Sequence, residues 1–380
     1  MKIPYWRLSA FYFCYFSFVG AFAPYWSLYL KSLAFSAFQI GVLMSLFQVM
    51  RTFAPTLWGW LADHTGHRVR IVQWTTAASL ACYLGVFAGD SFAWLFGVMA
   101  LMCFFWSAPM PLIDAITLRH LGDGASGYGR IRVWGSIGFI VMVIVLGYLL
   151  DVMPVKLLLW VILGLMVAVM VCARWIPEAV ITAHHGEQPS VLKIIRQPTV
   201  MAFLAASFLM AAAHGVYYNF YSIFLVEHGY SKTLVGWFWA VGVICEIAVF
   251  LLMPRLTRRF GLRNILLASF LIASLRFGMI GWGVDMVVLV FLAQTMHAAT
   301  FGSFHAVSVE VMHRIFHGRH HARGQAIYTS VSYGMGGAVG GLLSGWMWDP
   351  VGPQITFALS SVAGFIGFLL LWRWLKLEQS

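Results

Sequence analysis

Charged residues are scarce in this chain, and acids are scarcer than bases. Of 380 residues, 61% are hydrophobic and only 10% are charged, with 13 acids against 24 Lys and Arg. Soluble domains carry about 25% charged residues, and the mean hydropathy here is +0.83. The composition therefore excludes an ordinary soluble protein and predicts an all-α membrane protein.

Cysteine is also rare, and no lysine follows a glycine. The 5 cysteines lie in hydrophobic stretches without C-x-x-C spacing, so neither a disulfide framework nor a thiolate metal site is predicted. An ATP-driven pump needs a phosphate-binding loop in which lysine follows glycine. No motif supplies a nucleophile with its base and orienting group. We therefore expect neither an ATPase nor an enzyme, and no cofactor.

Twelve stretches are long and hydrophobic enough to cross about 30 Å of hydrocarbon. The first is too long and too aromatic for a signal peptide, so we expect it to be retained. A hydrophilic linker at 177–197 separates two predicted six-helix bundles, 1–176 and 198–380. The approximate spans are 6–31, 37–62, 71–89, 91–118, 131–151, 155–176, 198–226, 232–254, 263–281, 284–313, 323–347 and 352–374.

The net charge of +11 has a topological explanation. One alternating set of loops and the two termini hold all Lys and Arg except Lys31, Lys156, Lys232, Arg51 and Arg276. This bias predicts cytoplasmic termini in a bacterial inner membrane and makes a nucleic-acid partner unnecessary. We expect a monomer whose partners are the bilayer and a small-molecule substrate.

The two halves are related by a repeat of 195 residues. Repetition on this scale is typical of a duplicated architecture. The same spacing relates two opposite charges, Arg51 and Glu246, near the middles of spans two and eight. Other matches at this spacing are Ser27 with Ser222, Leu30 with Leu225, Phe35 with Tyr230, Ser36 with Ser231, Gly41 with Gly236, Gly66 with Gly261 and Arg68 with Arg263.

Arg51 and Glu246 are candidate substrate and proton sites. A charge at the centre of a membrane helix costs roughly 2.5 to 3.5 kcal/mol, so it usually faces a partner or a water-filled cavity. If the two meet between the halves, each offsets the other's desolvation. An incoming carboxylate can then take Arg51 through a bidentate contact while Glu246 takes up a proton. The alternative interpretation is a permanent structural bridge.

Spans seven, nine and ten hold further polar candidates. His214 begins a helical face with Tyr217, Tyr218 and Tyr221, which can stack a substrate ring or pack between helices. Asn219 lies off this face and is a candidate cap for a break in the helix.

His297 and His305 share a face of span ten, with Gln294 nearby. They suit a proton relay, although each can instead be a buried histidine bonded to a carbonyl. Arg276 in span nine is a candidate for attracting an anion or for a gating role. The alternative interpretation is that its side chain snorkels to the membrane interface.

The loop after span two reads GWLADHTGHRVR from Gly59 to Arg70. We expect Gly59 to allow close helix approach and Asp63 to accept from backbone amides at a neighbouring helix N-terminus. Gly66 turns the chain, and Arg68 fixes the loop at the cytoplasmic face. This spacing resembles the signature of the major facilitator superfamily, although the equivalent loop of the second half has Arg258 where the first has Asp63.

A second stretch, YGRIRVWGSIGF from Tyr128, resembles one branch of that superfamily. The branch contains the phenylpropionate permeases and the nucleoside and oligosaccharide proton symporters. The resemblance implies the fold of two six-helix bundles and a proton-coupled importer, and our hypothesis is uptake of an aromatic monocarboxylate. A nucleoside or sugar is the alternative substrate. Export is the alternative direction, although span five lacks the proline of exporter motifs.

Asp114 and Glu310 occupy corresponding places near the cytoplasmic ends of spans four and ten. We expect them to hold an inner gate by pairing with Arg130, Arg132 or Arg323. Span eleven is crowded with glycines, which allow either sliding or static close packing. Four histidines at and after the end of span ten lie among arginines, whose positive charge disfavours the binding of a divalent cation. No metal site is therefore predicted. These histidines are His313, His317, His320 and His321.

Overall fold

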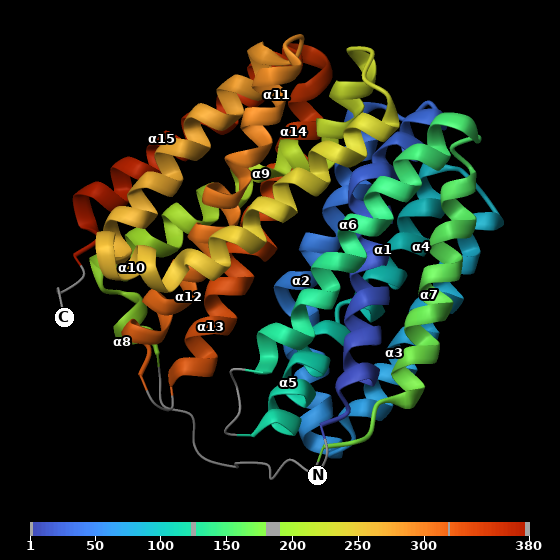
Figure 1. Cartoon of the computed structure of the whole chain (residues 1–380), viewed down its shortest axis with the longest axis horizontal. Helices are drawn as coiled ribbons and strands as arrows, with labels where there is room; N and C mark the ends of the chain where they lie inside the picture. The colour runs from blue at the N-terminus through green and yellow to red at the C-terminus, as the bar shows by residue number, and fades with distance from the viewer. Residues whose placement is uncertain (1–2, 123–126, 180–190, 318–319, 377–380) are drawn as a thin grey trace. The chain divides into compact units, whose positions relative to one another are not determined.

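The computed structural model describes residues 3–122, 127–179, 191–317 and 320–376, and these form helices without any strand. The prediction of an all-α protein is confirmed. The chain divides into two compact units, each drawn in Figure 1 as a bundle of long helices. Unit 1 is Met1–His185 with Ser231–Trp237, and unit 2 is Gly186–Tyr230 with Phe238–Ser380.

Unit 1 contains the helices coloured blue to green in Figure 1. A capping box starts α2, because the Ser36 hydroxyl accepts from the Gln39 backbone while the Gln39 side chain accepts from the Ser36 backbone. The helices are α1 (Tyr5–Ser32), α2 (Ala37–Thr65), α3 (Arg68–Tyr83), the 3₁₀ turn η1 (Leu84–Phe87), α4 (Phe92–Trp106), α5 (Pro109–Leu121), α6 (Tyr128–Val152) and α7 (Leu157–Trp175).

Unit 2 contains the helices that follow the predicted linker, apart from the first turn of α10. Residues 180–190 of the linker lie outside the described part of the chain. The elements of unit 2 are α8 (Leu192–Ile195), α9 (Pro198–Glu227), α10 (Lys232–Gly283), α11 (Val287–Thr295), the π-helix η3 (Ala298–Ser303), α12 (Phe304–Ile315), α13 (His321–Thr329), the π-helix η5 (Ser330–Gly336), α14 (Gly337–Val351) and α15 (Pro353–Trp374). The first turn of α10 belongs to unit 1.

Two glycines related by the repeat bend the chain at equivalent points. Gly66 ends α2 in the left-handed conformation with φ 69°, as predicted. Gly261 has φ 73° and interrupts α10 at a kink between the predicted spans 232–254 and 263–281. Only glycine adopts such angles without strain.

Among the described residues, nine helical stretches are long and hydrophobic enough to cross a membrane. This is fewer than the twelve stretches predicted, for three physical reasons. The two predicted spans of α10 run together at Gly261. The third predicted span is short as a helix, because α3 tightens into η1. The eleventh is divided where α13 passes into the π-helix η5.

Glycines bring the first helix of each half into backbone contact with a later helix. In unit 1, a Cβ on Gly20 would lie 2.8 Å from the carbonyl oxygen of Phe139 in α6. In unit 2, a Cβ on Gly215 would lie 2.3 Å from the carbonyl carbon of Gly340 in α14. Gly20 and Gly215 are themselves 195 residues apart, so the repeat preserves this contact. For α14, the structure shows the close packing that span eleven's glycines allow.

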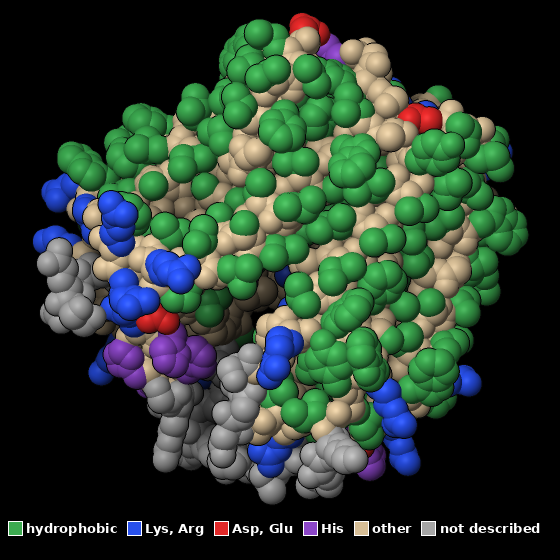
Figure 2. Space-filling view, in the orientation of Figure 1, with side chains coloured by type: hydrophobic (Ala, Val, Ile, Leu, Met, Phe, Trp, Pro, Cys, Tyr) green, Lys and Arg blue, Asp and Glu red, His purple; other side chains and the backbone are tan. Residues whose placement is uncertain are grey.

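Hydrophobic side chains cover most of the face seen in Figure 2, whereas Lys and Arg gather along its left and lower edges. The exposed side chains include Trp74 and Leu251, both 76% accessible. Soluble monomers rarely expose large contiguous apolar surface. This surface suits contact with lipid.

Candidate functional site

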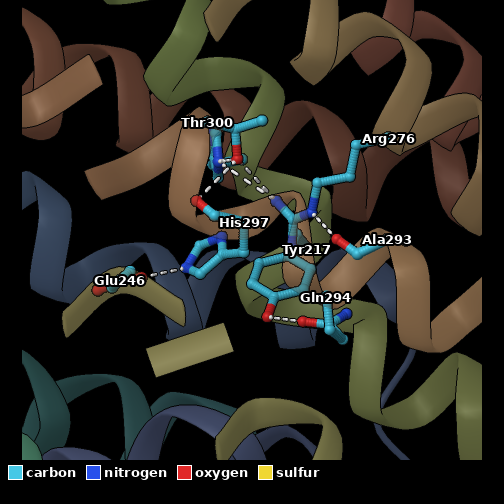
Figure 3. A network of polar contacts seen from close by, with 8 residues as sticks. Tyr217, Glu246, Arg276, Ala293, Gln294, His297 and Thr300 are labelled. Atoms are coloured by element: carbon cyan, nitrogen blue, oxygen red, sulfur yellow. Dashed lines mark hydrogen bonds and ion pairs between the residues drawn. The ribbon is translucent and has the colours of Figure 1, made fainter. Parts of the chain in front are cut away.

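Glu246 of α10 contacts His297 directly. The Nε2 atom of His297 lies 2.9 Å from Oε1 of Glu246, and the two side chains are only 6% and 13% exposed (Figure 3). His297 immediately precedes the π-helix η3, a distortion that is frequent at functional sites. Gly302 of that segment lies beside Glu246, because a Cβ there would be in ordinary contact, 3.5 Å from Cγ of Glu246.

Among the described residues, Glu246 is the one polar partner of the His297 imidazole. Its Nδ1 atom is buried and lacks a hydrogen-bond partner in the described part of the chain. The Nε2 contact is satisfied in two ways: a protonated Nε2 donates to the carboxylate, or a protonated Glu246 donates to Nε2. The pair can therefore hold one proton at either atom.

Arg276 lies in the same polar cluster and is fully buried. Its Nε donates to the carbonyl oxygen of Ala293 over 2.8 Å, and its Nη1 donates to Oγ1 of Thr300 over 3.3 Å. The guanidinium carbon stands 4.3 Å from the centre of the Tyr217 ring, in cation–π range. The interpretation that Arg276 snorkels to the interface is therefore wrong, because protein groups surround its head.

The polar face of α9 points into unit 2. His214 contacts the carbonyl oxygen of Met210 through Nδ1 at 2.8 Å, and its Nε2 lies 3.4 Å from Oγ1 of Thr300. Tyr217 donates to Oε1 of Gln294 over 2.9 Å. The side chains of His214 and Tyr217 are both buried. They therefore pack between helices, which was the alternative to stacking on a substrate ring.

Tyr218 differs from its neighbours on this face. It is partly exposed, and its ring centre lies 6.1 Å from that of Trp239 and 6.0 Å from that of His214. Of the predicted stacking residues, Tyr218 therefore best retains a surface for a ligand ring.

Asn219 does not cap a helix break, and that prediction is wrong. The helix α9 runs without interruption from Pro198 to Glu227. The Asn219 side chain instead donates to the carbonyl oxygen of Gly341 in α14 over 3.4 Å. This hydrogen bond links α9 to α14, the two helices whose backbones come close at their glycines.

His305 is separated from His297 by a ring. Phe301 stacks on both imidazoles, with ring centres 5.5 Å from His297 and 6.1 Å from His305. His305 Nδ1 lies 2.9 Å from the hydroxyl oxygen of Tyr333 in η5. The predicted relay therefore has no direct hydrogen bond between the two histidines.

Arg51 belongs to unit 1, whereas Glu246 belongs to unit 2. The Arg51 side chain is exposed and lies within electrostatic range of Tyr15. Its pairing with Glu246 stays a prediction.

The loop after α2 differs from expectation at two positions. Asp63 pairs with Arg68 of the same loop at 2.5 Å rather than with a helix terminus. The backbone amide of Val69, at the start of α3, instead donates to the two carboxylate oxygens of Glu178, at 3.1 and 3.2 Å. A Cβ on Gly59 would meet no atom within 4 Å, so close helix approach is not its role.

Asp114 makes tyrosine contacts in place of the predicted arginine pairs. It accepts from Tyr12 over 2.6 Å and from Tyr128 over 2.8 Å, and forms an ion pair with neither Arg130 nor Arg132. The guanidinium of Arg132 lies 3.8 Å above the ring centre of Phe16, and Arg130 is exposed. The hydroxyls of Tyr12 in α1 and Tyr128 in α6 reach this carboxylate directly and satisfy it with hydrogen bonds.

The polar cluster at the end of α12 and the start of α13 also differs from the prediction. Glu310 pairs with Arg314, one helical turn away, at 2.9 Å. Nδ1 of His313 lies 3.1 Å from Nδ1 of His321. Within the described ranges, no group of three or more potential ligands is placed to hold a metal.

Sequence reasoning missed several partners. Thr300 is one turn beyond His297 on the same predicted span, and this spacing could have drawn attention to it. Glu178 and the tyrosines that bind Asp114 gave no local signal, because their partners lie more than 100 residues away or on another helix.

Three comparisons bear on identity. The MFS_1 like family matches residues 5–359. The Probable 3-phenylpropionic acid transporter of Escherichia coli (strain K12) is 28% identical over 358 residues, covering 93% of each chain. The maltose permease of Geobacillus stearothermophilus is 26% identical over 370 residues, covering 95% of this chain and 93% of that one.

Solved structures show the same fold. The crystal structure of the nucleoside transporter NupG aligns with a TM-score of 0.83 over 100% of both chains, at 17% identity. The family match spans almost all of the sequence, as the resemblance in the α2 loop and the α6 segment predicts. The chain therefore belongs to the MFS_1 like family, and it is a multi-pass membrane transporter rather than an enzyme.

Proposed function

We propose that this transporter takes up a small aromatic monocarboxylate together with a proton. Twelve spans in two six-helix bundles, with cytoplasmic termini in a bacterial inner membrane, would alternate access to a site between the bundles. The observation that carries the proposal is the contact between Glu246 and His297 in the interior of unit 2. The 28% identity to a probable 3-phenylpropionic acid transporter supports the substrate class.

The proposed cycle assigns the two charges different tasks. The substrate carboxylate binds the Arg51 guanidinium, whose planar donors match a carboxylate bidentately. Glu246 carries the proton, and His297 offers that proton a second position 2.9 Å away. Tyr218, which is partly exposed beside the buried Trp239, offers a ring face for an aromatic group.

Uptake into proteoliposomes tests this function. Labelled 3-phenylpropionate, a nucleoside and maltose are compared under an imposed pH gradient, acidic outside, and after the gradient is collapsed with a protonophore. We expect accumulation of the aromatic acid alone, and only while the gradient lasts. Accumulation that ignores the protonophore would contradict proton coupling, and preference for a neutral solute would contradict the substrate class.

Replacing Arg51 by Ala should weaken the binding of aromatic acids by about 10- to 150-fold. Hydrogen bonds to a charged group contribute about 1.5 to 3 kcal/mol, which corresponds to that range. A series that pairs each acid with its amide, measured by thermal shift and by uptake, isolates the effect of the carboxylate.

The amide should lose little affinity in the Arg51 variant. Arg51→Lys is the matched control, because it keeps the charge but loses the fork of donors. An equal loss for acid and amide would show that Arg51 does not recognise the carboxylate.

A nucleoside or sugar is the alternative substrate. The likeness to NupG in fold and the partly exposed Tyr218 beside Trp239 favour it, because ring stacking accommodates neutral planar groups. In that case Arg51→Ala should affect uptake far less than Tyr218→Ala. Export remains the alternative direction, and efflux from preloaded vesicles distinguishes it.

A further inference from the structure

Asp151 holds the first turn of α10 against the end of α6. Its Oδ1 accepts the backbone amide of Lys232 over 2.8 Å. Its Oδ2 accepts both the backbone amide and the hydroxyl of Thr233, over 2.8 and 2.6 Å. The ammonium of Lys232 stands 3.8 Å from Oδ1. A carboxylate is the group best suited to a helix N-terminus, because unsatisfied amides and the helix dipole both favour negative charge there.

Close backbone approach supports the same contact. A Cβ on Gly147 would lie 2.5 Å from the carbonyl oxygen of Lys232, and one on Gly236 would lie 2.5 Å from that of Val143. Tyr25 donates to the carbonyl oxygen of Val143 over 2.6 Å. The first turn of α10 is thus seated on α6 and bound to it by the carboxylate.

The helix that begins at this contact also carries Glu246. Ser231–Trp237 belongs to unit 1, and the rest of α10 belongs to unit 2. Glu246 is thirteen residues beyond Thr233 on a continuous helical stretch, or about 20 Å along its axis. The first turn of α10 and the residue that contacts His297 therefore lie on one continuous helix.

We propose that Asp151 is a gating residue for transport. Its carboxylate binds the first turn of α10 to α6 in the conformation seen here, and the contact opens in the alternate conformation. The partial exposure of both Asp151 and Lys232 suits such a role, since water can solvate the carboxylate and the amides when they separate. The inference needs only that the protein is a transporter that alternates access. It depends on neither the substrate nor proton coupling.

Cysteine labelling in full-length protein, reconstituted in lipid nanodiscs, tests the gate without substrate. Val235→Cys reports opening at this end, because Val235 is 0% exposed. Val309→Cys, at a 36% exposed position of α12 beside Glu310, reports access from the predicted cytoplasmic side. Labelling by a membrane-impermeant maleimide is corrected for the native cysteines with a protein that lacks the added one.

Asp151→Asn should raise the labelling rate of Val235→Cys at least fivefold and lower that of Val309→Cys. An amide cannot accept at both positions, so the first turn of α10 is released. A reciprocal change at two distant positions reports a shift between access states, which local fraying would not produce. Asp90→Asn is the matched control, because Asp90 is exposed and makes no hydrogen bond in the described ranges.

Two further variants keep the test decisive. Thr233→Val removes the hydroxyl but keeps the amide, so it should change both rates in the same directions by about two- to threefold. Asp151→Glu should restore part of the original rates. Unchanged labelling at both positions in monodisperse Asp151→Asn and Thr233→Val proteins would overturn the proposal, as would faster labelling at Val235 with none of the opposite change at Val309.

Discussion

Glu246→Gln is expected to abolish accumulation of substrate against its gradient while exchange of preloaded substrate continues. Glutamine has nearly the same shape and can still hydrogen-bond His297, but it cannot release a proton. The loaded carrier can therefore reorient in both directions, whereas the proton-coupled return of the empty carrier stops. The expected loss of concentrative uptake exceeds 100-fold, measured in proteoliposomes beside counterflow.

The controls separate proton carriage from folding. Asp285→Asn removes an acid at an exposed position beyond α10 and should leave both measurements unchanged. The thermal midpoint of Glu246→Gln should stay close to that of the parent protein, since the contact with His297 keeps one hydrogen bond. Undiminished concentrative uptake in the variant would rule out Glu246 as the proton carrier.

Gly340→Ala is expected to destabilise the protein by about 3 kcal/mol or more, the upper range for overpacking. The new Cβ would lie 2.1 Å from the carbonyl oxygen and 2.5 Å from the Cα of Ala212. Because both atoms belong to the backbone, α9 and α14 must move apart, and Asn219 then loses its hold on Gly341. The thermal midpoint of purified protein and the yield of monodisperse protein measure the effect.

Gly164→Ala is the matched comparison for this substitution. It lies within α7, where a Cβ would meet no atom within 4 Å. Replacing glycine by alanine inside a helix stabilises it by up to about 1 kcal/mol when nothing clashes. The two variants should therefore shift the midpoint in opposite directions. Equal thermal midpoints for Gly340→Ala and Gly164→Ala would show that α9 and α14 can move apart without loss of stability.

Composition and the long hydrophobic stretches were sufficient to predict an all-helical membrane protein. Long hydrophobic stretches have few alternatives to helix in a bilayer, because lipid cannot satisfy backbone polar groups. The spacing of 195 residues pairs Gly66 with Gly261, and the structure gives both a positive φ. Span ends were less predictable, since α10 continues through the loop that separates two predicted spans.

Residue partners were predictable only where they are close in sequence. Arg276, Glu246 and His297 were recognised because a buried charge or imidazole is rare in a span. The identity of their partners was not, because α9, α10 and α11 meet only after folding. Asp114 illustrates the point: arginines were the expected partners, yet the tyrosines of α1 and α6 reach it.

By itself the sequence determined that this chain is a helical membrane protein and which polar residues its hydrophobic stretches contain. Only the tertiary structure decided that Glu246 contacts His297, that Arg276 is enclosed, and that Asp151 binds the first turn of α10. The physical reason is that hydrophobicity acts on each segment independently, whereas a hydrogen bond needs two groups placed within about 3 Å by the packing of separate helices.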